Sequence, residues 1–200
     1  MIKIGKVFFR YLEFEVPEGI YEPREDSFLA GNYLWGVDLE GKKILDVGTG
    51  TGFLGIICNE KGGKVHATDI NPKAIKTSIE NADRNNLEID AFESDLFQKV
   101  HEKYDIILFN APYLPGKRDN SNMEEKSWVG GEKGNETLIN FLEKADKHLK
   151  KSGFILLVFS SISGIKEIFD KINGKNMEYH VIKEEKVDWE KLLLVKCYKF

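Results

Sequence analysis

The stretch Asp46-Val-Gly-Thr-Gly-Thr-Gly52 decides the fold of this chain. It closes an apolar run, Lys43–Val47, and opens a segment whose apolar residues have helical spacing, Phe53–Glu60. A glycine-rich turn between a buried strand and a helix lets the backbone approach an adenosine-type cofactor closely. We therefore predict a strand, a turn and a helix of an open α/β sheet, with a ligand site at the turn.

Strand-like and helix-like segments alternate along the chain. Runs rich in β-branched and aromatic residues predict strands over Lys43–Val47, Lys64–Thr68, Ile89–Glu93, Tyr104–Phe109 and Phe154–Phe159. Helical spacing of apolar residues predicts helices over Phe53–Glu60, Pro72–Arg84, Glu136–Leu149 and Ile165–Ile172, the second with Asn71 as its N-cap. This alternation is typical of a parallel sheet whose strands are connected by helices.

Antiparallel hairpins are expected near both ends of the chain. Tyr179–Lys186 and Leu192–Lys199 have strand patterns joined by a short polar turn around Asp188, which predicts one antiparallel strand in the sheet. Near the start, Val7–Val16 alternates like a hairpin, and Glu25–Tyr33 has a helical pattern. The predicted fold class is therefore α/β, with a seven-stranded, mostly parallel, Rossmann-like sheet, helices on both faces and a C-terminal antiparallel hairpin.

Length and composition limit the class of protein. The 200 residues are expected to form one domain, 1–200, in which 1–40 make an N-terminal hairpin and helix extension. The net charge of -4 and the pI of about 5.7 disfavour nucleic-acid binding over a broad basic surface. No apolar run approaches the roughly 20 residues of a membrane span, and the first residues lack a signal-peptide core. We therefore expect a soluble, cytoplasmic protein.

The cysteines, the histidines and one charged segment give no sign of catalytic chemistry. Cys58 and Cys197 lack CxxC spacing and are expected to be reduced and buried. The histidines are scattered without metal-ligand spacing, so no metal site is expected. The charged stretch Gly116–Lys126 has no apolar period and is expected to be a mobile loop.

Acidic residues follow three successive predicted strands. Asp46 opens the glycine-rich turn, Asp69 ends the second strand, and Asp95 follows the third. A dinucleotide site prefers G-x-G-x-x-G to the G-x-G-x-G found here, and an acid beside the turn would repel a pyrophosphate. The same acid can attract the amino group of a methionine moiety. Asp69 is placed to accept from ribose hydroxyls, and Asp95 with Leu96 to hold adenine, which favours S-adenosylmethionine.

Asn110-Ala-Pro-Tyr113 ends the fourth predicted strand with an amide, a rigid proline and an aromatic ring. An amide nitrogen is a poor nucleophile because its lone pair is delocalised into the carbonyl. The Asn110 side-chain oxygen and the Ala111 carbonyl can accept the two hydrogens of such a nitrogen. Pro112 stiffens the loop, and Tyr113 can stack on the planar target group. Together with the glycine-rich turn, this motif predicts methyl transfer from S-adenosylmethionine to a nitrogen.

With these residues in view, the chain resembles the class I S-adenosylmethionine-dependent methyltransferases over nearly its whole length. More narrowly, it resembles the HemK-related release-factor glutamine methyltransferases, in the short archaeal and eukaryotic branch that lacks the helical N-terminal domain of the bacterial enzymes. The most specific piece is Tyr21-Glu-Pro-Arg-Glu-Asp-Ser27, which is similar to the family's segment ahead of the first strand. Trp128-Val-Gly-Gly131, followed by Gly134, resembles the family's glycine-rich loop after the transfer motif.

The resemblance implies S-adenosyl-L-methionine as the cofactor and N5 of the glutamine in the Gly-Gly-Gln motif of a translation release factor as the target. It implies cofactor contacts for Tyr21, Ser27, Asp46, Gly48, Thr49, Gly50, Asp69, Ile70, Asp95, Leu96 and Asn110. It implies catalytic roles for Asn110, Pro112 and Tyr113, which would bind the substrate together with Ala111. Relatives in this branch often work with a small zinc-binding activator subunit that covers an apolar surface and adds a strand at the sheet edge.

One residue departs from the family's pattern, which usually reads Asn-Pro-Pro-Tyr. Ala111 stands where the first proline is expected. Alanine keeps the carbonyl but frees φ, so we expect a less pre-organised loop rather than lost function.

Several alternatives stay open at this point. A planar exocyclic amino group of adenine or guanine in RNA or DNA presents nearly the same chemistry to Asn110–Tyr113, although the chain lacks a basic track or an added recognition domain. Lys117, Arg118, Lys126 and Lys133 form the local basic cluster near the site. Methylation of a lysine, or a non-catalytic scaffold that keeps the fold, are the remaining hypotheses.

Overall fold

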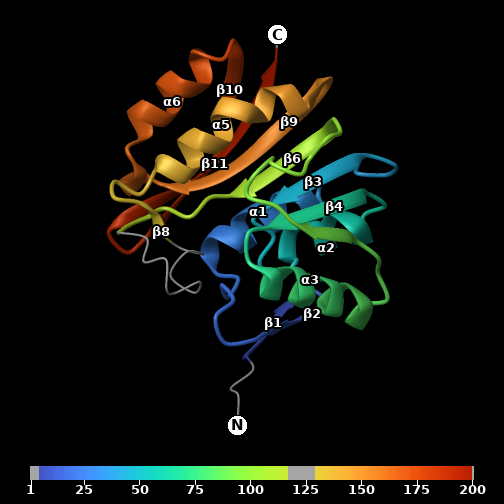
Figure 1. Ribbon diagram of the computed structural model, residues 1–200. Helices are drawn as coiled ribbons and strands as arrows, with labels where there is room; N and C mark the ends of the chain where they lie inside the picture. Colours follow the sequence, from blue (N-terminus) through green and yellow to red (C-terminus); the bar gives the residue numbers. More distant parts are fainter. Residues whose placement is uncertain (1–4, 117–128, 200) are drawn as a thin grey trace.

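The structure of this protein is a computed structural model, and it describes residues 5–116 and 129–199. The expected mobile loop, Gly116–Lys126, therefore lies outside the described residues except for Gly116. The expected N-terminal hairpin is formed by β1 (Gly5–Phe9) and β2 (Leu12–Val16), which pair antiparallel at one end of the molecule (Figure 1).

A seven-stranded sheet forms the centre of the molecule (Figure 1). In spatial order its strands are β10 (Met177–Val187), β11 (Glu190–Lys199), β9 (Leu149–Ser160), β6 (Tyr104–Asn110), β3 (Lys43–Val47), β4 (Lys64–Asp69) and β5 (Asp90–Glu93). β11 runs antiparallel to both of its neighbours, and the other pairs are parallel. The mostly parallel sheet and its C-terminal antiparallel hairpin are confirmed.

Helices cover both faces of the sheet, as predicted (Figure 1). The elements are α1 (Glu25–Trp35), α2 (Phe53–Glu60) and α3 (Pro72–Arg84) on one face, and α5 (Glu136–His148) and α6 (Ile165–Asn173) on the other. Successive strand residues enter different cores, because side chains alternate across a sheet. Ile44 packs with the α1 and α2 side chains, whereas Leu45 packs with those of α5 and α6.

Three features differ from the sequence-based expectations. β9 begins at Leu149, directly after α5, rather than at Phe154, and Leu149 has extended backbone angles instead of closing the helix. Two short strands, β7 (Leu114–Pro115) and β8 (Val129–Gly131), form a parallel pair that the sequence did not predict. A short 3-10 helix, η1 (Ser161–Ser163), follows β9. β7, β8 and η1 have only two or three residues each, which is too short to carry a periodic pattern in the sequence.

Asn81 of α3 and Asn85, the C-cap residue of that helix, bind the open edge of β2 in the manner of a neighbouring strand. The Asn85 amide accepts from Glu13 N at 2.9 Å and donates to Glu13 O at 2.8 Å. Asn81, which is buried, accepts from Glu15 N at 2.8 Å and donates to Glu15 O at 3.0 Å and to Thr51 O at 2.9 Å. Four helical residues rise about 6 Å, close to the repeat of two strand residues, so the spacing matches.

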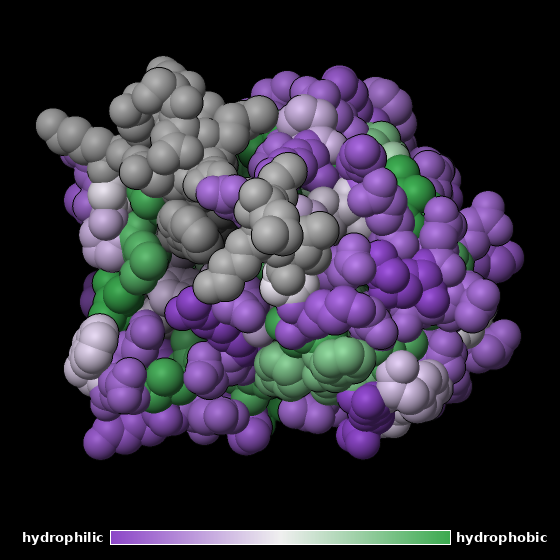
Figure 2. Space-filling view, turned by 90° about the horizontal axis from the view of Figure 1, so that it is seen from below, coloured by the Kyte–Doolittle hydropathy of each residue, from purple (hydrophilic) through white to green (hydrophobic). Residues whose placement is uncertain are grey.

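One face of the molecule is largely polar (Figure 2), and the two cysteines are buried. Seen from below, the face that carries α3 and the first hairpin is mainly hydrophilic, with hydrophobic residues in separate areas (Figure 2). Within the described ranges, no helix combines the length and the apolar character needed to cross a membrane. Cys58 and Cys197 are free thiols, and both are buried as predicted.

Replacing Asn81 with alanine should lower the free energy of unfolding by about 2–4 kcal/mol, because buried backbone groups of β2 and of the glycine-rich turn lose their partner. Urea unfolding followed by circular dichroism measures this loss. Glu80→Ala, an exposed neighbour on the same helix, is the matched control and should change stability by less than about 0.5 kcal/mol. Equal losses in the two variants would contradict a structural role for the asparagine.

Candidate functional site

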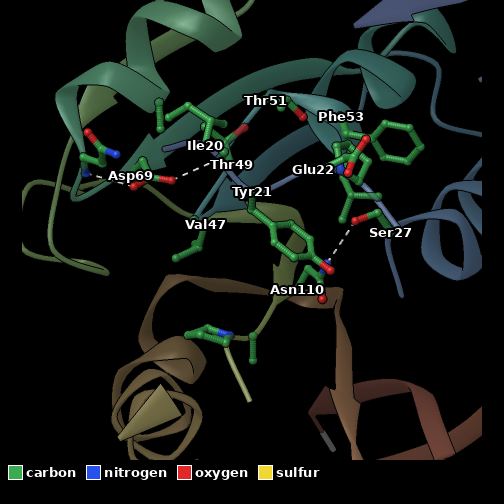
Figure 3. Close-up of a pocket in the computed structure, with 18 of the residues that line it drawn as sticks. Ile20, Tyr21, Glu22, Ser27, Val47, Thr49, Thr51, Phe53, Asp69 and Asn110 are labelled. Atoms are coloured by element: carbon green, nitrogen blue, oxygen red, sulfur yellow. Dashed lines mark hydrogen bonds between the residues drawn. The ribbon is translucent and has the colours of Figure 1, made fainter. Parts of the chain in front are cut away.

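A cavity of about 960 Å³ opens at the carboxyl ends of β3, β4 and β6. Every residue that the sequence assigned to the cofactor, to catalysis or to the substrate lines it. Figure 3 shows the arrangement, with Asp69 and Thr49 in one part of the cavity and Ser27, Tyr21 and Asn110 in another. The carboxyl edge of a parallel sheet is where such folds bind ligands.

Asp46 fixes the glycine-rich turn through two hydrogen bonds of its buried side chain. Its side chain is 2% exposed, and Oδ2 accepts from Thr49 Oγ1 at 2.7 Å and from Gly55 N at 3.1 Å. Burial raises the pKa of this carboxyl to about 6, even though both hydrogen bonds favour the charged form. The acid therefore ties the turn to the first turn of α2.

Asp69, the last residue of β4, joins two loops at the cavity wall. Its Oδ2 accepts from Gly50 N at 3.0 Å, and its Oδ1 accepts from Asn71 N at 2.9 Å (Figure 3). Gly50 has φ +56 and no atom within 4 Å of the position of a Cβ, so the backbone itself lies open to the cavity. Burial raises the pKa of Asp69. Each carboxylate oxygen keeps lone-pair capacity for a further donor.

The third acid lies on a more exposed part of the wall. Asp95 is exposed and accepts from Gln98 Nε2 at 3.1 Å through Oδ2. Leu96 follows with φ +49, and its carbonyl accepts from Ser94 Oγ at 3.0 Å, which holds this unusual backbone. Ile70 is 42% exposed and lines the same cavity. A carboxylate and two apolar side chains are therefore available to a planar heterocycle.

A chain of hydrogen bonds orients the amide of Asn110. The buried carboxylate of Asp26 accepts from Ser27 Oγ at 3.1 Å and from Ser27 N at 2.5 Å. Ser27 Oγ in turn accepts from Asn110 Nδ2 at 3.2 Å (Figure 3). This arrangement leaves Asn110 Oδ1 buried without a hydrogen-bond partner among the described residues. A buried amide oxygen without a partner is costly, and at a cavity wall it marks a place for a donor.

Two tyrosines extend this network. Tyr21 donates to Asp26 Oδ2 at 2.7 Å, and a side-chain hydrogen bond links Tyr113 to Tyr21. Burial raises the pKa of both phenols, and the charge of Asp26 adds to this effect. Both rings therefore stay neutral and act through hydrogen bonds and their faces. Tyr21 and Asn110 both line the cavity and are labelled in Figure 3.

Ala111 has an anchor that the sequence did not reveal. It is 2% exposed, and its N–H donates to Val158 O of β9 at 3.1 Å. A proline at this position could not make that bond. The expectation of a less restrained loop did not include this anchor, which extends the backbone contact between β6 and β9 into the transfer motif.

The glycine-rich segment after the transfer motif packs directly on its backbone. A Cβ on Gly130 would lie 2.5 Å from Pro112 O, and one on Gly134 would lie 2.5 Å from Tyr113 O. Thr137 Oγ1 donates to Gly130 O at 3.1 Å. Glycine is therefore required at both positions, because the two backbone segments lie too close together to leave room for a Cβ. Trp128 of this segment, like Lys117, Arg118 and Lys126 of the expected basic cluster, lies outside the described residues.

Sequence reasoning missed several residues of the cavity wall. They are Ile20, Glu22, Asp26, Thr51, Phe53, Asn71 and Glu190. Asp26 lies within the quoted segment but was given no role, because burial of a carboxylate cannot be read from local pattern. Glu190 lies at the start of β11, far along the chain, and only the hairpin topology brings it to the cavity.

The geometry separates two chemical functions within one cavity. One part offers carboxylates, open backbone and apolar side chains to a ligand that contains a sugar and a planar ring. The other part offers a fixed amide oxygen, a carbonyl and an aromatic ring. These groups suit a planar nitrogen group that donates hydrogen bonds.

Comparison with known proteins identifies the family of the chain. The family model of the methyltransferase small domain matches residues 36–187. A putative protein N5-glutamine methyltransferase of Methanocaldococcus jannaschii is 39% identical over 183 residues, which cover 90% of this chain and 92% of that protein. Methyltransferase HEMK2 of Homo sapiens is 29% identical over 192 residues, and the match covers 90% of each chain.

A solved structure supports the fold independently. The E. cuniculi Mtq2-Trm112 complex, described as responsible for methylation of the eRF1 translation termination factor, contains a chain that matches with a TM-score of 0.75 and 24% identity. The match covers 91% of this chain and 99% of that chain. The family model and the 39% identical relative together show that the protein belongs to the methyltransferase small domain family.

Proposed function

We propose that this chain transfers a methyl group from S-adenosylmethionine to the side-chain amide nitrogen, N5, of a glutamine in a translation release factor, in its Gly-Gly-Gln motif. The observation that carries this proposal is the buried, unpartnered Oδ1 of Asn110, held in place through Ser27 at the cavity wall. The names of the relatives, which include protein N5-glutamine methyltransferase and release factor glutamine methyltransferase, point to the same acceptor. The proposed reaction belongs in the cytoplasm, where such a substrate is found.

The cavity wall fits S-adenosylmethionine, which supplies the electrophilic methyl group when bound. Asp69 has acceptor capacity for ribose hydroxyls, and Asp95 with Ile70 and Leu96 suits the adenine. The methionine part has a positive sulfonium and an amino group, and the glycine-rich turn with Asp46 offers negative charge there. Gly48, Thr49 and Gly50 would contact it through the backbone, and Tyr21, Ser27 and Asn110 would contact it from the other side.

The target amide would be held by acceptors on both of its hydrogens. Asn110 Oδ1 and the Ala111 carbonyl supply these acceptors. Holding both hydrogens turns the nitrogen lone pair toward the methyl donor, and Pro112 and Tyr113 keep the planar group in place. The product nitrogen can release its proton to water, so the chain needs no strong base. Positioning of this kind lowers the activation free energy by up to about 7–11 kcal/mol in intramolecular analogues.

A nucleic-acid base is the competing acceptor, and the charges of the cavity disfavour it. The acidic lining residues are Glu18, Glu22, Asp26, Asp46, Asp69, Asp95 and Glu190, and Arg24 is the basic one among the described residues. Arg24 is itself paired with Glu22 at 3.7 Å. Phosphates next to such a wall would be repelled, whereas binding to nucleic acid normally relies on lysine and arginine.

We also propose a small zinc-binding activator subunit as partner, at the β5 edge of the sheet. β5 has four residues and, of the strands that the structure describes, pairs only with β4, so its other edge is open within this part of the chain. The opposite edge strand, β10, carries exposed Lys183 and Glu184 and a register irregularity after Val181, features that discourage strand pairing. Partly buried Phe92 on β5 and Ile79 of α3, 39% exposed, offer apolar surface beside the open edge.

Asn110→Ala should abolish methylation of the release factor while it leaves S-adenosylmethionine affinity within about threefold, because it removes an acceptor made for the target nitrogen. The measurement is transfer of radiolabelled methyl from S-adenosylmethionine to the organism's own release factor, with calorimetry for cofactor binding. The factor with its Gly-Gly-Gln glutamine changed to alanine is the matched substrate control and should stay unlabelled.

Either of two results would contradict the proposal. Label on the glutamine-to-alanine factor would place the methyl group elsewhere. Label on total RNA or DNA, with none on the factor in the presence or absence of a co-expressed partner, would favour the base-methylating alternative.

Asp69→Ala should raise the dissociation constant for S-adenosylmethionine by about 10- to 100-fold, since a charged acceptor is worth about 1.5–3 kcal/mol. Calorimetric titration of the purified chain measures this constant. Asp83→Ala, an exposed acid of α3 that does not line the cavity, is the control and should leave it unchanged. An unchanged constant in Asp69→Ala would mean that this acid only holds its two loops.

Affinity for S-adenosylmethionine should rise with pH between 5 and 7, by up to about tenfold per unit, and then level off. Burial raises the pKa of Asp46 to about 6, so below this pH the empty site holds a neutral carboxyl. A cationic ligand favours the carboxylate, and binding in acid must therefore release a proton. Titrations at pH 5.5 and 7.5 in buffers of different ionisation enthalpy measure this release. Asp46→Asn should flatten the profile, leaving the contribution of Asp69, and an unchanged profile would exclude Asp46 as its source.

A further inference from the structure

The most exposed large hydrophobic side chain of the described residues lies next to the cavity. Trp189 is 85% exposed at the turn between β10 and β11, whose last and first paired residues are Val187 and Glu190. The next residue, Glu190, lines the cavity. An exposed tryptophan of this size costs hydration free energy in the isolated chain, and at a surface it is typical of a contact for a partner.

The turn itself does not need a tryptophan. Two-residue hairpin loops favour asparagine, aspartate and glycine because of their backbone angles, and Asp188 meets this preference with φ +47. Trp189 adds no packing to either hydrophobic core. The residue is therefore better explained by what it contacts outside the chain.

Two further exposed apolar residues lie around this turn. Leu114, 44% exposed, follows directly after the transfer motif and lines the cavity, and Ile162 of η1 is 37% exposed. η1 contacts both β7, which contains Leu114, and β11. Lys191 N donates to Ser161 Oγ at 2.9 Å, and Ser160 Oγ is hydrogen-bonded to the Glu190 carboxylate. We name Leu114, Ile162, Trp189 and Glu190 the hairpin rim.

The charge of the cavity mouth indicates the chemistry of the partner. Glu190 of the hairpin rim adds to the acidic lining described above, in which the acidic side chains outnumber the basic ones among the described residues. An exposed indole and a carboxylate on consecutive residues, Trp189 and Glu190, suit a cationic side chain, since an indole ring attracts a cation and a carboxylate pairs with it. The chain already uses a tryptophan in this way: the Arg10 guanidinium and the Lys61 ammonium lie 5.0 Å and 5.4 Å from the centroid of the Trp35 ring.

We propose that the hairpin rim docks the substrate protein through a lysine or arginine that flanks the methylated glutamine. The cationic group lies on Trp189 and pairs with Glu190, while its aliphatic stem covers Leu114 and Ile162. This inference rests on the proposed function, because the rim borders the place where Asn110 holds the target amide. It deepens that function by assigning a recognition surface outside the catalytic residues.

Trp189→Ala should raise the KM for the release factor about tenfold and change kcat by less than twofold, since docking precedes transfer. Trp189→Phe should recover most of the loss, because a ring face remains. The dissociation constant for S-adenosylmethionine should stay unchanged in both. Phe8→Ala, which removes a 58% exposed aromatic ring that does not line the cavity, is the matched control and should leave KM unchanged.

The cationic part has a separate test. Glu190→Gln should raise the KM for the factor and reduce its dependence on sodium chloride, because a charge pair is lost. Replacing the lysines and arginines within five residues of the target glutamine by glutamine in the factor should raise the wild-type KM. The same change should have little effect with Glu190→Gln, if the two charges act on each other.

Each outcome supports or overturns the inference. A wild-type KM in Trp189→Ala, or a loss in kcat alone, would overturn docking at the rim. An unchanged salt dependence in Glu190→Gln would overturn the cationic partner. If the wild-type chain methylates no release factor either alone or with a co-expressed activator subunit, the proposed substrate is wrong and the proposed occupant of the rim is wrong with it. If instead the wild-type chain is active and the rim variants have the same KM as the wild type, only the proposed role of the hairpin rim is wrong.

Discussion

The hydrogen bonds from Asp26 through Ser27 to Asn110 are the constraint on which the site depends. A primary amide has two ends of similar shape, and only one of them can accept a hydrogen bond. Because Asp26 takes the hydrogen of Ser27 Oγ, that oxygen is left to accept from Asn110 Nδ2. The amide is thereby turned so that Oδ1 lacks a partner within the described structure. An acidic residue that touches no substrate in our proposal thus sets which atom of Asn110 is available.

The rest of the fold brings the partners of this chain of bonds together. Ser27 lies on α1, and Asn110 ends β6, 83 residues later. α1 is held against the sheet by its own apolar residues, and the hairpin ahead of it is tied to α3 by Asn81 and Asn85. Asn81 also donates to Thr51 O in the glycine-rich turn. The N-terminal extension is therefore part of the cavity wall as well as a cover for the sheet.

The same architecture explains how one cavity serves two ligands. Parallel strands bring Asp46, Asp69 and Asn110 to one edge, so the distance between the methyl donor and the acceptor is set by the rigid sheet. Segments distant in sequence complete the wall. The backbone of Gly130 packs closely against Pro112 O, and Glu190 of the C-terminal hairpin lines the cavity. The hairpin rim includes Glu190 and the exposed Trp189 beside it, and in our proposal this rim receives the macromolecular substrate.

The local sequence was sufficient to predict a mostly parallel α/β sheet, the bounds of β3, α2 and α3, and a set of ligand-binding candidates that all line one cavity. It could do so because periodicity, caps and glycine-rich turns are local, and because strand ends share one edge. Only the tertiary structure decided the role of Asp26, the anchor from Ala111 to Val158 O and the position of Glu190. Those depend on burial and on contacts between distant segments, which no local pattern encodes.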